Sequence, residues 1–148
     1  MLYIVDMNVK YKKYIDYIIN DIELPYLKYL NMYGLSDNEM VMILSKVFNE
    51  SVSIEGAKVY NTDGNRIYCE DSDGFWYKKE WDANGNLIYC EDSDGYWEKY
   101  VYDINGNLIY SENSYGYWTK REYDSNGNLI YQEDSTGNIV NKRYERQI

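Results

Sequence analysis

The chain contains no histidine, only one proline and only two phenylalanines among its 148 residues. The missing histidine removes the commonest general base and a frequent metal ligand. The sequence also contains no nucleophile motif and no phosphate-binding loop. These absences predict a protein that is not an enzyme, with no catalytic residues and no cofactor.

Cysteine is equally scarce, and Cys69 and Cys90 lie 21 residues apart. Two reduced residues of a cytosolic protein are the favoured interpretation, while a disulfide between them stays open. No stretch approaches 18 uninterrupted apolar residues, and residues 1–5 are followed at once by Asp6. We therefore expect no membrane span, no signal peptide and a cytoplasmic location, which is the host cytoplasm if the chain is phage-encoded.

Positive charge is also in deficit. The net charge is −10, with 5 Lys/Arg against 8 Asp/Glu in residues 1–57 and 10 against 17 in residues 58–148. An acidic chain of this kind repels nucleic acids and anionic membranes. We therefore expect neither direct nucleic-acid binding nor membrane binding, and a basic protein is the natural partner.

What the sequence has in excess is tyrosine, with 20 residues, and a 21-residue unit that recurs four times within residues 58–148. Each copy runs through an Asn/Asp-rich turn into Ile-Tyr-x-Glu and then into a second polar turn. An aromatic pair follows in the first three copies. A fixed period of this length is typical of repeat proteins, whose units bury apolar surface against their neighbours. The glycines of the two turns are Gly64, Gly85, Gly106 and Gly127, and Gly74, Gly95, Gly116 and Gly137.

Residues 1–57 have a different pattern, which predicts a small helical cap. Apolar residues recur at helical spacing over residues 11–19. A second helix is expected to start at Pro25, as its first helical residue, and to end at Gly34. Ser36 and Glu39 form a capping-box pattern ahead of a third helix. Since repeat arrays need closed ends, we expect this cap to cover the first strand of the repeats.

Within residues 58–148 the apolar period becomes two, which is typical of strands. Asn-Gly between alternating residues indicates two-residue type I′ turns, in which both central residues have positive φ. Such turns place Lys99 opposite Glu112, Lys120 opposite Glu133 and Tyr102 opposite Ile109. The second turn, as in Asp92–Gly95, suits a type I turn with a left-handed glycine. The fold class expected is α+β, a helical cap followed by an antiparallel meander of about eight strands.

Two groups of acidic residues resemble reactive sites, but neither pattern is complete. The Asp82-Ala-Asn84-Gly sequence resembles a calcium loop, but its glycine comes too early and no bidentate glutamate follows. The glutamates of the repeats could pair as in glycosidases, but their sites are identical and lysines are expected opposite three of them. We therefore expect no metal site and a structural role for Glu70, Glu91, Glu112 and Glu133.

Tyr-Asp-x-Asn-Gly-Asn-Leu, followed by Asp-x-x-Gly and the next Tyr-Asp, resembles the YD repeat of RHS and teneurin-type proteins. The resemblance covers roughly residues 58–145. It implies a strand-turn unit, whereas the toxin-enclosing shell of that family requires dozens of copies and this chain has four. The Gly-aromatic-Trp rhythm is also loosely similar to the choline- and glycan-binding repeats of Gram-positive surface proteins.

Two classes of function fit these features. The first is a non-catalytic protein whose acidic, Tyr-rich face docks on a basic surface of a protein partner. Such a protein is loosely similar to small acidic phage-encoded anti-defence proteins of the anti-CRISPR type, which inhibit a host nuclease as nucleic-acid mimics. The alternative within this class is that the acidic surface merely keeps the protein soluble.

The second class is an aromatic repeat that binds a glycan or a choline-like ligand, because Trp and Tyr faces stack on sugars and hold quaternary ammonium groups. A homodimer is compatible with either class. The residues expected to contact a partner are the turn carboxylates Asp71, Asp73, Asp92, Asp94, Asp103 and Asp124 and the aromatics Tyr96, Trp97, Tyr117 and Trp118.

Overall fold

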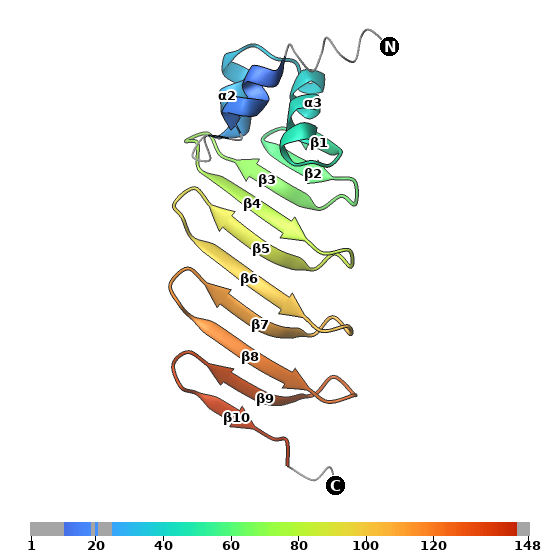
Figure 1. Cartoon of the computed structure of the whole chain (residues 1–148), viewed down its shortest axis with the longest axis vertical. Helices are drawn as coiled ribbons and strands as arrows, with labels where there is room; N and C mark the ends of the chain where they lie inside the picture. The colour runs from blue at the N-terminus through green and yellow to red at the C-terminus, as the bar shows by residue number, and fades with distance from the viewer. Residues whose placement is uncertain (1–10, 19, 21–24, 145–148) are drawn as a thin grey trace. The chain divides into compact units, whose positions relative to one another are not determined.

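The computed structural model describes residues 11–18, 20 and 25–144. The chain divides into two compact units, Met1–Lys78 and Lys79–Ile148. The first unit contains the helices and the first strands, and the second contains most of the repeats (Figure 1).

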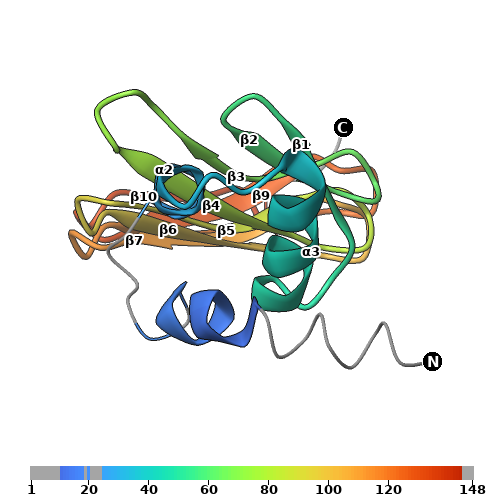
Figure 2. The same ribbon diagram turned by 90° about the horizontal axis from the view of Figure 1, so that it is seen from above.

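Three short helices occupy the described part of the N-terminal region, as the sequence predicts (Figure 2). Residues 11–18 are helical, and they are followed by α2 (Tyr26–Met32) and α3 (Asp37–Val47). The Ser36 hydroxyl accepts the Glu39 N–H and the Glu39 carboxylate accepts the Ser36 N–H, so the predicted capping box is confirmed. Pro25 is the N-cap of α2 rather than its first helical residue, and the left-handed Gly34 follows the helix as predicted.

The prediction of about eight strands is wrong, because the sheet has ten antiparallel strands that pair in sequence order. One extra strand, β1 (Val52–Glu55), lies in the region expected to be only helical. It forms a tight hairpin with β2 (Lys58–Asn61), whose turn contains Gly56 at a φ of 59°. The last strand is β10 (Ile139–Asn141), which pairs with β9 despite the loss of the aromatic pair there. The remaining strands are β3 (Arg66–Glu70), β4 (Trp76–Trp81), β5 (Leu87–Asp92), β6 (Trp97–Tyr102), β7 (Leu108–Asn113), β8 (Trp118–Tyr123) and β9 (Leu129–Asp134).

The predicted type I′ turns are also wrong. The loop between β6 and β7 has three residues, because the N–H of Asp103 donates to the carbonyl of Asn107 and the N–H of Gly106 donates to the carbonyl of Asp103. Gly106 has a φ of 83°, but Asn105 before it does not have a positive φ. Among the described non-glycine residues, only Asn49, outside the repeats, has one. The Asn of each Asn-Gly pair therefore stays right-handed, which is typical of a type I turn followed by a left-handed glycine.

The longer loop changes the pairing next to the turn but not further along the strands. Lys99 lies opposite Glu112 and Lys120 opposite Glu133, as predicted. Tyr102 lies opposite Leu108 instead of Ile109, because the register shifts at a β-bulge between Val101 and Tyr102. The same shift recurs one copy later, between β8 and β9.

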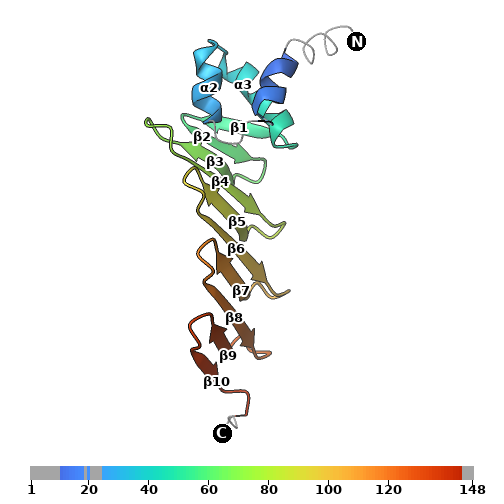
Figure 3. The same ribbon diagram turned by 60° about the vertical axis from the view of Figure 1, so that its left-hand side comes forward.

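The two units differ in how much apolar surface they bury. In the first unit, a core joins the helices to β2, β3 and the start of β4. In the second unit, β5–β10 form one layer (Figure 3), and no described residue of that unit is buried. A single layer cannot enclose a core, so turns and cross-strand pairs must hold it together. The fully enclosed side chains are Ile18, Leu30, Ile43, Leu44, Val59 and Tyr68.

Two further expectations concern cysteine and membranes. Cys69 and Cys90 are both free thiols, so the alternative of a disulfide is not realised. Partial burial and the neighbouring Glu98 carboxylate raise the pKa of the Cys90 thiol. Among the described residues, no helix combines the length and the apolar character that crossing a membrane requires.

We predict that stability depends on the core of the first unit. Replacing the fully buried Leu44 by Ala should lower the free energy of unfolding by about 2–5 kcal/mol, because it leaves a cavity. Ile104, which is 98% exposed, is the control, and its replacement by Ala should change stability by no more than about 0.5 kcal/mol. Urea unfolding followed by circular dichroism measures both, and equal losses would contradict the assignment.

Candidate functional site

One face of the repeat sheet carries the same four residue types in each of the first three copies, and we call it the tryptophan face. In the third copy the residues are Tyr110, Glu112, Trp118 and Lys120. Cross-strand pairing places Tyr110 opposite Lys120 and Glu112 opposite Trp118, so all four lie on one side of the sheet. The equivalent residues are Tyr68, Glu70, Trp76 and Lys78 in the first copy and Tyr89, Glu91, Trp97 and Lys99 in the second.

Side-chain contacts on this face repeat with the sequence. The Tyr110 hydroxyl donates to the Glu112 carboxylate at 3.0 Å, and the Lys120 Nζ lies 5.1 Å from the centre of the Trp118 ring. The second copy has the same tyrosine–glutamate bond and the same lysine–tryptophan contact, and the Lys99 Nζ lies 3.8 Å from Glu112. Each lysine thus contacts the tryptophan of its own copy, and Lys99 also pairs with a glutamate of the next copy. Neighbouring side chains therefore hold these lysines in place.

The turn aspartates fix the loops through their side chains. Oδ1 of Asp103 accepts the backbone N–H groups of Asn105 and Asn107, each at 2.9 Å. Asp82, Asp124 and Asp134 hold their own turns in the same way. Hydrogen bonds to the ionised form lower the pKa of the Asp82, Asp103 and Asp134 carboxyls, so these groups stay charged in the folded protein.

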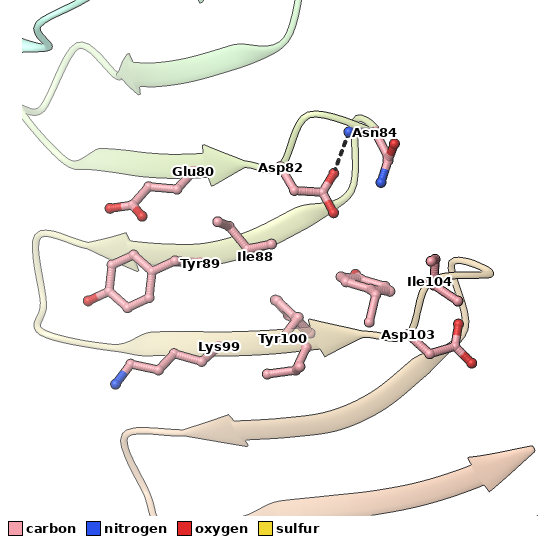
Figure 4. Close-up of a pocket in the computed structure, with 11 residues that line it drawn as sticks. Glu80, Asp82, Asn84, Ile88, Tyr89, Lys99, Tyr100, Asp103 and Ile104 are labelled. Atoms are coloured by element: carbon pink, nitrogen blue, oxygen red, sulfur yellow. Dashed lines mark hydrogen bonds between the residues drawn. The ribbon is translucent and has the colours of Figure 1, made fainter.

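A shallow hollow of about 780 Å³ lies between two of these turns in the second unit (Figure 4). Glu80, Asp82 and Asp103 contribute carboxylates to its lining, and Lys99 contributes the one ammonium group among the lining residues. Tyr89 and Val101 contribute apolar surface. The hollow is therefore acidic, open to solvent and suited to a basic or amide-rich group rather than to an anion.

The aromatic residues expected to contact a partner do not lie together. Trp97 and Trp118 belong to the tryptophan face. Tyr96 belongs to the opposite face, where its hydroxyl and that of Tyr100 donate to the Glu98 carboxylate. Those two hydrogen bonds lower the pKa of Glu98 against the opposing effect of burial. Tyr117 lies just before the first residue of β8, Trp118, and is 59% exposed.

The aspartates expected to contact a partner lie at the two ends of the strands. Asp103 and Asp124 occupy the turns at one edge, in the same series as Asp82. Asp71 and Asp92 cap the turns at the other edge, where Asp73 and Asp94 are exposed. The predicted residues therefore do not form one site. The aspartates lie in turns at both ends of the strands, and the aromatic residues lie on both faces of the sheet. Asp82 and Glu80, which line the hollow, were not predicted.

Glu70 has a role that the local sequence does not reveal. Its carboxylate accepts the N–H of Leu27 at 3.1 Å and that of Lys28, so it satisfies the first turn of α2, which has no side-chain cap of its own. The Tyr68 hydroxyl accepts the N–H of Tyr26 at 2.9 Å and donates to Glu70 at 2.7 Å. Helix α2 therefore begins on the tryptophan face of the first copy.

Within the described residues, no group of three or more His, Cys, Asp or Glu side chains is placed to hold a metal ion. No known protein family matches the chain, and no curated protein is similar to it in sequence. The observed strand-turn unit agrees with the antiparallel hairpin repeat expected from the sequence.

We predict that the turn carboxylates make stability depend on pH. Their pKa values are lower in the folded state than the ordinary value near 4. Their stabilising effect is complete above the unfolded value and is lost as the pH falls through the folded values. The urea midpoint should therefore fall below about pH 4 and stay unchanged by these groups between pH 6 and 8.

The control for this prediction keeps the turns but removes the charge. Asn61 and Asn113 already occupy equivalent turn positions and accept the same backbone N–H groups. The variant with Asp82→Asn, Asp103→Asn and Asp134→Asn should lose less stability on acidification. An unchanged acid profile in this variant would show that the aspartates do not cause the pH dependence.

We predict that Tyr68→Phe destabilises the protein by about 1–3 kcal/mol, because the buried N–H of Tyr26 loses its acceptor and Glu70 loses a donor. Tyr110→Phe removes the equivalent hydroxyl from the open third copy and should cost less than about 1 kcal/mol. Urea unfolding measures both variants. Similar losses would mean that α2 does not depend on Tyr68.

Proposed function

We propose that the chain is a non-catalytic binding protein whose acidic repeat docks on a basic surface of a protein partner, such as the nucleic-acid-binding groove of a nuclease. The observation that supports this most directly is the row of turn carboxylates at one edge of the second unit, Asp82, Asp103 and Asp124. Each is held in place by backbone N–H groups of its own turn. Fixed charges lose little conformational entropy when they pair with a cation.

The spacing of these carboxylates also supports the proposal. Equivalent turns are separated by two strands, which corresponds to roughly 9.5 Å in a regular sheet. Asp82 and Asp103 resist protonation because their pKa values are lowered. A regular row of permanent negative charges is complementary to a groove that normally holds a nucleic-acid backbone, and it would speed association with such a groove.

The tryptophan face argues against choline or a similar quaternary ammonium as the ligand. Lys99 and Lys120 already place their ammonium groups over the rings of Trp97 and Trp118, at 4.8 and 5.1 Å from the ring centres. A quaternary ammonium would have to displace these lysines, and it would compete with an internal cation at high effective concentration. A choline-like ligand therefore has no specific observation in its favour.

The test is recovery of partners by tagged full-length protein from a host lysate at low and at high salt, with mass spectrometry. We expect a basic protein to be retained at low salt and released at high salt, because exposed charges are screened. Recovery of no protein, with retention on a glycan or choline resin instead, would overturn the proposal.

Two charge-matched variants make this experiment specific. Asp82→Asn, Asp103→Asn and Asp124→Asn together remove three charges but keep the turn acceptors that Asn61 and Asn113 provide elsewhere. This variant should lose the partner. The matched control, Glu50→Gln, Glu55→Gln and Asp63→Asn, removes three exposed charges from the first unit. It should retain the partner, and equal loss in both variants would mean that only net charge matters.

A further inference from the structure

The first copy of the repeat shows what the tryptophan face can bind. The ring of Tyr26, the first residue of α2, stacks on Tyr68 with 4.9 Å between ring centres and 21° between planes. The Nζ of Lys78 lies 4.9 Å from the centre of the Tyr26 ring and 4.6 Å from that of Trp76. Together with the Glu70 carboxylate on the helix N–H groups, these contacts form a receptor for an aromatic residue at the start of a helix.

This contact is well buried. Tyr26 is 5% exposed, Tyr68 is 1% exposed and Trp76 is 6% exposed. The carboxylate of Glu70 also faces the positive end of the α2 dipole. The first copy therefore combines apolar burial, ring stacking and charge-assisted hydrogen bonds in one small site.

The last copy is covered by a different group of the same chain. The guanidinium of Arg143 lies 3.7 Å from the centre of the Tyr131 ring and pairs with Glu122. This copy lacks the tryptophan and the lysine that the other three have, since Asn138 and Ile139 replace the aromatic pair. The Tyr131 ring is thus covered by Arg143.

The second and third copies have the same four residue types as the first copy. No aromatic ring of the described chain stacks on Tyr89 or Tyr110, in contrast to Tyr68. The side chain of Glu112 is 34% exposed and that of Lys99 is 53% exposed. In both copies the lysine is exposed and the tyrosine, glutamate and tryptophan are half-buried, so each set is partly open to solvent.

We infer that the second and third copies bind the first turn of a helix in a partner protein, led by an aromatic residue as α2 is led by Tyr26. The partner's aromatic ring stacks on Tyr89 or Tyr110 beside the lysine. Its free N–H groups donate to the carboxylate of Glu91 or Glu112. This inference rests on the proposed function, because it states which chemical feature of the protein partner the repeat recognises.

The test uses the full-length chain and a peptide of residues 25–34, Pro-Tyr-Leu-Lys-Tyr-Leu-Asn-Met-Tyr-Gly, with its helix held by a staple between positions 28 and 32. These two positions can carry the staple without disturbing the contact. Met32 is 77% exposed in the protein, and Lys28 contacts Glu70 through its backbone N–H. We expect saturable NMR shifts of the Trp97 and Trp118 indole groups. A peptide with Ala in place of Tyr26 should give none.

Paired variants of the protein locate the site. Glu91→Gln with Glu112→Gln should weaken peptide binding by about tenfold, because two charge-assisted contacts are lost. Glu98→Gln is the matched control, since Glu98 also accepts tyrosine hydroxyls but lies on the opposite face. It should change the affinity less than about twofold.

Three results would overturn the inference. The first is the absence of saturable shifts at millimolar peptide. The second is equal weakening of peptide binding by the Glu98→Gln control. The third is shifts confined to Trp76, which would mean that the peptide only displaces α2. If the peptide fails while a basic partner is still recovered in a salt-sensitive way, the helix-start mode is wrong and acidic docking stands. If both fail, the proposed function falls as well.

Discussion

The hydrogen bonds from each turn to its own capping side chain are the interaction on which the repeat depends. In the second unit, no described residue is buried, so strand register cannot be fixed by a hydrophobic core. It is fixed at the ends of the strands instead. Asp103 closes a loop with both its backbone and its carboxylate, and Gly106 supplies the left-handed residue that the loop requires.

The same turns also determine the charge of the surface. A carboxylate that accepts two backbone N–H groups is stabilised in its ionised form, so structural capping and negative charge come from one group. Asn113 shows that the turn itself does not need the charge, since its amide oxygen accepts the same N–H groups. The choice of Asp at most turns therefore adds negative charge beyond what the hydrogen bonds of the turn require, and under the proposed function a basic partner recognises this added charge.

Much of this arrangement follows from local sequence, and the errors have physical causes. The sequence spacing correctly predicts that Lys99 lies opposite Glu112, because the alternation of side chains and the position of the turn determine that pair. It misplaced Tyr102, because Asn-Gly favours a two-residue loop while the aspartate side chain stabilises a three-residue one. The role of Glu70 was beyond local reasoning, since its partners Leu27 and Lys28 lie over 40 residues away in sequence.

The contact between α2 and the first copy connects the fold to recognition. An isolated helix of this length is marginal in water, and α2 has no side-chain cap from its own segment, so the sheet must supply the acceptor for its first turn. The repeat then presents the same acceptor, ring and cation again in the next two copies. Because Glu70 and Glu112 each lie opposite a tryptophan of the adjacent strand, the arrangement that stabilises the cap recurs in the third copy, and the inferred binding of a partner helix rests on this recurrence.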